Sequence, residues 1–200
     1  MTTTTRSSRE RLAKLTTDIF APGNLVIVGL PLIGLAAGSP GSGFLWGCLA
    51  ALFAGVIPLT VIAVGVRRGR LTDIHVVRRE QRTTPLMLGI CSVVVGVVLV
   101  YVLPAPPEVR DLTAAMLAGL VAAAAVTRAW KISIHAAVAV GVTVVFAATF
   151  GALGWLFAIP AAAVGWSRVQ LGVHTVTQVI AGAALGAVVT GGLYAALHGF

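Results

Sequence analysis

The chain has 200 residues, of which 58% are hydrophobic and only 10% are charged. A soluble domain carries about a quarter charged residues, so this composition excludes an ordinary soluble protein and indicates a membrane protein. The formal net charge of +8 does not indicate nucleic-acid binding, because the basic residues cluster between apolar runs. Such clusters indicate a fixed membrane orientation and contacts with anionic lipids or phosphate groups.

The N-terminal segment, residues 1–18, is polar and basic, with Arg6, Arg9, Arg11 and Lys14. We expect a cytoplasmic tail that is disordered at first and can continue as an interfacial helix. A basic start before an apolar run also describes a signal peptide, here with LAAGS at 35–39 as the cleavage site. We favour the tail, because the next apolar run follows almost at once, as in a helical hairpin.

Residues 19–200 are expected to form one transmembrane helical domain. A helix needs about 20 apolar residues to cross a bilayer, and the runs that fit are 20–38, 43–66, 86–103, 112–129 and 173–197. Residues 134–164 are too long for one crossing and contain GALG at 151–154, which predicts a tight hairpin of two short helices. The fold class is therefore an all-α bundle with seven crossings, or six if the hairpin is one bent helix.

The distribution of lysine and arginine predicts the orientation of the bundle. With seven crossings and the N-terminus inside, 13 of the 14 basic residues lie on the inner side and only Arg110 lies outside. Three polar segments, 67–85, 128–135 and 165–174, then emerge on the same face of the cell membrane. We expect them to converge on a single cytoplasmic site.

The first polar segment contains DIHVVRREQR, residues 73–82. If this stretch is helical, Arg78 and Arg82 lie one turn apart and their guanidinium groups can grip a phosphate together. Asp73 is one of the few acids near this segment, together with Glu80. The alternative is a basic loop that only fixes orientation, which is the role we expect for Arg67, Arg68 and Arg70.

The second segment, RAWKISIH, alternates polar and apolar residues from Arg128 to His135. In an extended conformation Lys131, Ser133 and His135 point the same way, and they precede a helix whose free N–H groups favour an anion. The alternative is a Trp–Lys interfacial anchor followed by a buried histidine.

The third segment brings Arg168 and His174 to the two sides of a turn at Gly172. Gln178 follows His174 by one helical turn and can fix which imidazole nitrogen is free to react. The alternative is an interfacial His–Gln pair with no chemical role.

Together these segments supply cations, two histidines and a serine, with almost no carboxylates. Neither a pair of aspartates for magnesium nor a His/Cys cluster for zinc is present in the sequence pattern, so we expect neither metal nor cofactor. Metal-free phosphoryl transfer needs cations for the equatorial oxygens, a nucleophile and an acid for the leaving oxygen. This set of side chains can fill all three roles.

The same residues resemble the type 2 phosphatidic acid phosphatases, membrane lipid phosphatases related to soluble acid phosphatases and vanadium haloperoxidases. The family pattern is K-x6-RP, PSGH and SR-x5-H-x3-D. Ser167, Arg168 and His174 match the third part at the correct spacing, while Ser133-Ile134-His135 retains only part of the second. The first part has no clean match, and the nearest stand-ins are Arg78, Arg79 and Arg82 ahead of Pro85, with Lys131 as the lysine.

Two departures from the family pattern stand out. Gln178 replaces the final aspartate, so it can orient His174 but brings no negative charge; in this the chain is similar to some polyprenyl-diphosphate phosphatases of the superfamily. Two spans separate the first and second polar segments, which is further than the family usually has. This spacing makes the assignment of Arg79 and Arg82 weaker than that of His174.

The resemblance implies a lipid phosphate or diphosphate phosphatase, with an isoprenoid or phosphatidate-like substrate. It implies that His174 is the nucleophile that becomes phosphohistidine, that His135 is the acid and base, and that Arg168, Lys131, Ser133, Arg79 and Arg82 bind the phosphate. Phosphotransfer to an alcohol would use the same residues. The alternative from another class is a non-catalytic membrane protein, such as a phospholipid-binding subunit or a transporter. The sequence leaves open whether the chain forms a homo-oligomer.

Overall fold

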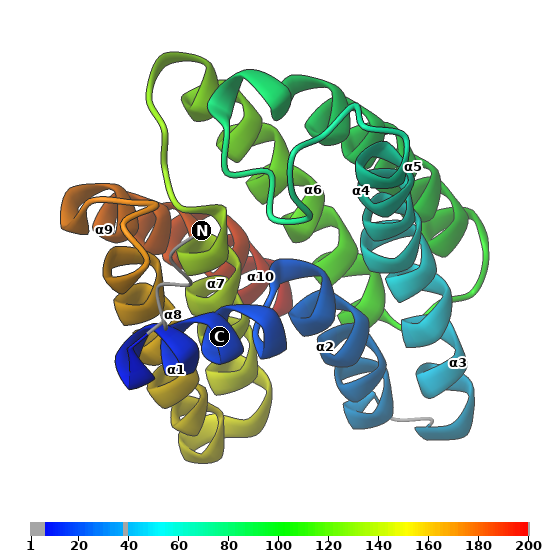
Figure 1. Ribbon diagram of the computed structural model, residues 1–200. Helices are drawn as coiled ribbons and strands as arrows, with labels where there is room; N and C mark the ends of the chain where they lie inside the picture. Colours follow the sequence, from blue (N-terminus) through cyan, green and yellow to red (C-terminus); the bar gives the residue numbers. More distant parts are fainter. Residues whose placement is uncertain (1–6, 38–39, 200) are drawn as a thin grey trace.

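The computed structural model describes residues 7–37 and 40–199, and these residues are helical, with turns and short extended links between the helices (Figure 1). The α-helices are α1 (Ser8–Ile19), α2 (Pro22–Ala36), α3 (Pro40–Ala51), α4 (Ile57–Arg67), α5 (Thr83–Val102), α6 (Pro107–Ala129), α7 (Ile134–Phe150), α8 (Ala158–Gln170), α9 (Val176–Leu185) and α10 (Leu193–His198). Short π-helical segments join α3 to α4 and α9 to α10, so that each pair forms one long helix. No strand occurs in the described part of the chain, which confirms the all-α prediction.

Five helical runs are long and apolar enough to cross a membrane, and α1 with α2, bent by 44°, is a sixth. The five runs are Gly41–Arg67, Arg79–Val102, Pro107–Ala129, Ile134–Gln170 and Val176–His198. They coincide with the spans expected from the sequence, because a run of about 20 apolar residues can satisfy its backbone in lipid only as a helix. The chain is thus a polytopic membrane bundle.

The longest of these runs, Ile134–Gln170, folds back on itself (Figure 1). A tight 3-10 turn, Gly151–Phe157, separates α7 from α8, and the ring centroids of Phe146 and Phe157 lie 4.4 Å apart across it. Gly154 lies so close to the backbone of Phe146 that any side chain there would collide with it. The hairpin predicted from GALG is therefore confirmed. If its two arms are counted separately, and α1 with α2 as one span, the described residues contain seven crossings.

The N-terminal segment continues as a helix, one of the two forms that we expected for it. Ser8–Ile19 is a helix whose start is fixed by reciprocal hydrogen bonds between Ser7 and Glu10, and α1 packs against α8. The buried residues on α1 are Ala13, Thr16 and Thr17. Residues 1–6, with Arg6, and residues 38–39 of the alternative cleavage site lie outside the described residues.

Small residues let the helices approach closely, as expected for a bundle in lipid. On α9 and the π-helical segment after it, Gly182 packs against the backbone of Ser133 and Gly186 against the backbone of Ala137. A Cβ atom at either position would overlap those carbonyl groups. Both glycines therefore serve close helix packing, which holds the start of α7 against α9.

We expect Gly182→Ala to lower the free energy of unfolding by about 1–3 kcal/mol, the usual cost of overpacking a tight contact. Gly41→Ala is the matched control, because no atom lies within 4 Å of a Cβ built there. Thermal unfolding of the two variants in the same detergent measures the difference. Equal midpoints for the two variants would show that the contact between α9 and Ser133 is loose.

Candidate functional site

The turn between α8 and α9 places Arg168 and His174 side by side. The backbone amides of Val173 and His174 both donate to the carbonyl oxygen of Arg168, at 3.2 Å each. Gly172 adopts a left-handed φ of +64°, which closes this turn without the steric cost that other residues would meet. The spacing SR-x5-H therefore has a structural reason. It joins Arg168, in the last turn of α8, to His174, the residue before the N-cap of α9.

Gln178 orients the imidazole of His174. Its side-chain oxygen Oε1 accepts from the backbone amide of Thr175 at 3.3 Å, which fixes the orientation of the amide group, and it lies 3.1 Å from His174 Nδ1. Since that oxygen can only accept, Nδ1 carries the proton and Nε2 has the free lone pair. Gln178 also completes the N-terminal capping box of α9 with Thr175, a second role for the residue that departs from the family pattern.

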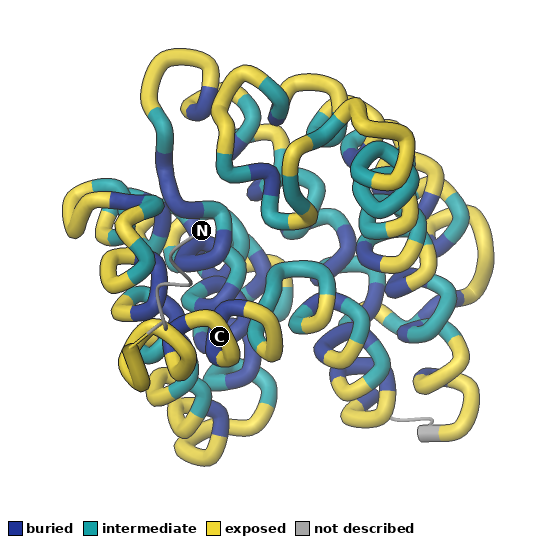
Figure 2. The backbone as a smooth tube through the Cα atoms, in the orientation of Figure 1, coloured by how far each residue is buried: buried dark blue, intermediate teal, exposed yellow. Residues whose placement is uncertain are grey.

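The second polar segment is extended, as predicted, from Trp130 to Ser133 and then enters α7. The backbone amide of Ser133 donates to the carbonyl oxygen of Gln178 at 3.1 Å, which ties this segment to the start of α9. The Ser133 hydroxyl caps α7 by accepting from the amide of Ala136, and His135 lies buried in the first helical turn. Figure 2 shows the link between α6 and α7 buried where it enters α7.

The first polar segment is not the helix that we expected for residues 73–82. The Asp73 carboxylate accepts from the backbone amides of His75 and Val77 and closes a tight turn, in which Val76 has a positive φ of 46°. The chain becomes helical only in the short 3-10 turn Arg79–Gln81 and then in α5. Asp73 competes with the helix for these amides, a preference typical of short polar side chains.

Arg82 ties this loop to the second polar segment. Its Nε donates to the carbonyl oxygen of Val76 at 2.9 Å and its Nη1 to that of Ile132 at 3.1 Å. Arg79 is exposed and donates to the carbonyl of Ala129 at 3.0 Å instead, and Arg78 is exposed on the loop. Of the three arginines that could stand for the first family motif, Arg79 and Arg82 both contact the second polar segment, and Arg82 also interacts electrostatically with Arg168 and His174 of the third.

Five basic side chains come together at this end of the bundle, and we call them the cationic cup: Arg82, Lys131, His135, Arg168 and His174. Arg168, His174 and Arg82 all interact electrostatically with His135. Arg168 is only 2% exposed, yet its Nε and Nη2 have no hydrogen-bond partner, and neither has Nε2 of His135. Buried N–H groups are rarely left unpaired, and an oxyanion between them would satisfy them.

Helix α1 supplies residues that the sequence did not single out. The Thr17 hydroxyl lies 3.0 Å from that of Ser167 and 3.5 Å from Arg168 Nη1, so α1 holds the arginine in place. Asp18 Oδ1 lies 2.9 Å from His75 Nε2, and the ring of His75 packs edge-on against His135 with centroids 5.2 Å apart. No spacing rule links residues 17 and 18 to residues 75 and 167; the packing of α1 on α8 brings Thr17 to Ser167, and tertiary packing against the loop brings Asp18 to His75.

Burial, together with the charges of the cup, lowers the pKa of the two members of the cup outside the spans, Lys131 and His174. Burial lowers the pKa of Lys131, and Arg82 and Arg168 lower it further, against a weaker opposing effect of Glu80. Burial is also the main reason why the pKa of His174 falls to about 4; Arg168, Arg82 and Lys131 lower it as well, while the hydrogen bond to Gln178 raises it. His174 is therefore a neutral imidazole at pH 7, as a nucleophile must be.

This shift predicts how the stability of the protein depends on pH. The pKa of histidine in an unfolded chain is about 6.5, so between pH 6.5 and about 4 the unfolded chain binds more protons at this position than the folded chain does. The free energy of unfolding must then fall as the pH falls through this window. We expect His174→Gln to lose less thermal stability between pH 7 and pH 5 than the unsubstituted protein; equal losses would contradict a buried neutral His174.

Among the described residues, no three His, Cys, Asp or Glu side chains are grouped so that they could hold a metal ion. No protein-family model, no curated protein and no solved structure matches this chain. The candidate site therefore stands on its own geometry.

Proposed function

We propose that the chain removes phosphate from a membrane lipid phosphate or diphosphate through a phosphohistidine at His174. The observation that carries the proposal is the set of buried nitrogen atoms without partners, on Arg168 and His135, beside an imidazole whose Nε2 lone pair is free. A phosphate group matches all of them at once, because it offers oxygens to the donors and phosphorus to the lone pair.

In the first step His174 Nε2 attacks phosphorus and a P–N bond forms while the bond to the leaving oxygen breaks. Arg168, Lys131 and Arg82 stabilise the charge on the equatorial oxygens, and the Ser133 hydroxyl, whose oxygen already caps α7, still has a proton to donate. His135, as the imidazolium that the bound phosphate dianion favours, gives its proton to the leaving alkoxide or phosphate.

In the second step a water molecule attacks the phosphorus of the phosphohistidine. His135, now neutral, takes a proton from that water as a general base. The P–N bond breaks, His174 regains its lone pair, and inorganic phosphate leaves. An alcohol in place of the water would give phosphotransfer with the same residues.

The substrate class follows from where the cup lies. It is formed by the ends of helices that have the length and composition of membrane spans, so a phosphate that enters it can keep its apolar tail in the bilayer. We therefore propose an isoprenoid or phosphatidate-like lipid, and we place the cup at the cytoplasmic face of the cell membrane, because lysine and arginine concentrate on the inner side of membrane proteins.

The test is phosphate release by the purified protein in detergent with a chelator present, from a polyprenyl phosphate, a polyprenyl diphosphate and a phosphatidate. We expect release from at least one lipid, a loss of at least about 10²-fold in Arg168→Gln, and no change in Arg67→Gln, an exposed arginine outside the cup. If the protein binds these lipids but the unsubstituted and Arg168→Gln proteins release phosphate equally, the chain is a non-catalytic lipid binder.

A further inference from the structure

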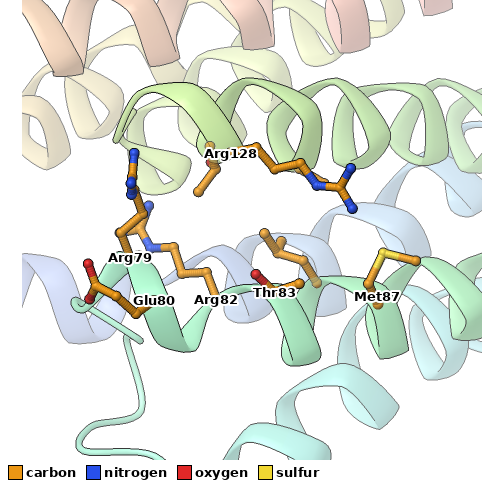
Figure 3. Close-up of a pocket in the computed structure, with 9 residues that line it drawn as sticks. Arg79, Glu80, Arg82, Thr83, Met87 and Arg128 are labelled. Atoms are coloured by element: carbon orange, nitrogen blue, oxygen red, sulfur yellow. The ribbon is translucent and has the colours of Figure 1, made fainter.

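A second cationic site lies beside the cup, between the start of α5 and the end of α6. It is a cavity of about 200 Å³ (Figure 3). Its lining combines three arginines, one glutamate, two hydroxyls and three apolar side chains: Arg79, Glu80, Arg82, Thr83, Leu86, Met87, Ala124, Thr127 and Arg128. The lining thus combines basic and apolar side chains, and the phosphate chemistry proposed above uses neither Arg128 nor the hydroxyls.

The hydroxyl of Thr127 indicates that this cavity is built for a polar ligand. Other threonines within the helices, Thr60, Thr113, Thr143 and Thr149, satisfy their hydroxyls by donating to the carbonyl four residues earlier. Thr127 is only 4% exposed, yet its Oγ1 has no hydrogen-bond partner. A buried hydroxyl that gives up this ready partner loses free energy, unless a ligand in the cavity completes it.

The charges of the cavity favour an anion. Figure 3 shows Arg79 and Arg82 at one end with Glu80, while the guanidinium of Arg128 reaches over the cavity toward Met87. Three arginines against one glutamate leave two positive charges in excess. The first amides of α5 lie at the same place, since Thr83 begins that helix and also lines the cavity.

The apolar side chains that line the cavity lie on two helices that have the length of membrane spans. Leu86 and Met87 lie on α5 and Ala124 lies on α6, and Met87 is 46% exposed. The cavity is therefore at the depth where a bilayer changes from phosphate headgroups to acyl chains. We propose that it binds an anionic phospholipid, with the phosphodiester between Arg128 and the hydroxyls of Thr127 and Thr83 and an acyl chain along Leu86 and Met87.

The experiment is a titration of the purified full chain with dioctanoyl phosphatidylglycerol, a phosphodiester that offers no phosphomonoester to the cup. We expect saturable binding that Arg128→Gln weakens about tenfold, the loss of one charge-assisted contact, and that Thr127→Val weakens less. Arg70→Gln and Thr84→Val, an exposed arginine and an exposed threonine outside the cavity, should stay within about twofold of the unsubstituted protein.

Two other ligands and one further variant complete the binding experiment. Dioctanoyl phosphatidylcholine should bind more weakly, and inorganic phosphate should bind far more weakly, because it lacks the acyl chains. Met87→Trp, which fills the exposed end of the cavity, gives a second test if Arg128→Gln fails to fold, and it should also weaken binding. Equal affinity for the two phospholipids, equal affinity for inorganic phosphate, or binding that neither variant weakens would overturn the proposal.

Discussion

We expect His174→Ala protein to release no phosphate from a polyprenyl phosphate above the level of a protein-free control, a loss of at least about 10³-fold. The substitution removes the only atom of the cationic cup whose lone pair is fixed by a hydrogen bond on the other side of its ring. It leaves the cations in place, so the lipid still binds. His198→Gln is the matched control, because this histidine pairs with Asp111 on α6 rather than with the cup.

A labelled phosphate group distinguishes loss of the nucleophile from general damage to the site. With a substrate labelled on phosphorus, rapid quenching in alkali should retain label on the unsubstituted protein, since phosphohistidine survives alkali and is lost in acid. His174→Ala protein should carry no label, and the His198→Gln protein should be labelled normally. Label that persists in His174→Ala protein would assign the nucleophile to another residue.

Much of the fold was predictable because lipid leaves the backbone few choices. A run such as 86–103 can satisfy its amides in a bilayer only as a helix, and α5 has the expected position. GALG predicted the turn between α7 and α8 because glycine tolerates both the tight bend and the close backbone contact there. The packing of the N-terminal helix α1 against α8 was harder to foresee, since it depends on contacts between residues far apart in the sequence.

The local parts of the cup were predictable, but its assembly was not. Arg168, His174 and Gln178 are close in sequence, and their spacing alone fixes a turn and a cap. The loop with Arg82 depends on how the Asp73 carboxylate competes for backbone amides, which periodicity does not show. The neighbours Asp18 and His75 meet through tertiary packing of α1 against the loop that holds His75, so no pattern in the sequence pointed to them.

The carboxylates nearest to the cup lie on the side of His135. Gln178 brings no charge to His174, yet a carboxylate–imidazole pair is present beside the other histidine, since Asp18 contacts His75 and His75 packs on His135. Asp18 and Asp73 also interact electrostatically with Arg168. Negative charge thus lies on the His135 side of the cup and not beside His174, which fits the neutral nucleophile that we propose at His174.

The second prediction with a large expected loss of turnover concerns His135. We expect His135→Gln to lower the turnover of a polyprenyl phosphate by about 10²–10⁴-fold, the usual contribution of a general acid and base. His135 is buried and its Nε2 has no hydrogen-bond partner, so this atom is free for the proposed proton transfer. The same variant should react differently with an aryl phosphate, whose leaving group departs without a proton.

With p-nitrophenyl phosphate the first step in His135→Gln protein needs no acid, whereas hydrolysis of the phosphohistidine still lacks its base. Phosphorylated protein must then accumulate, and rapid mixing should show a burst of about one nitrophenol per protein followed by slow turnover. Ser133→Ala serves as the comparison and should slow both steps without a burst. In the proposed mechanism this serine donates to the phosphate and moves no proton to the leaving group. A loss in His135→Gln that is equal for both substrates, with no burst, would assign His135 a purely structural role.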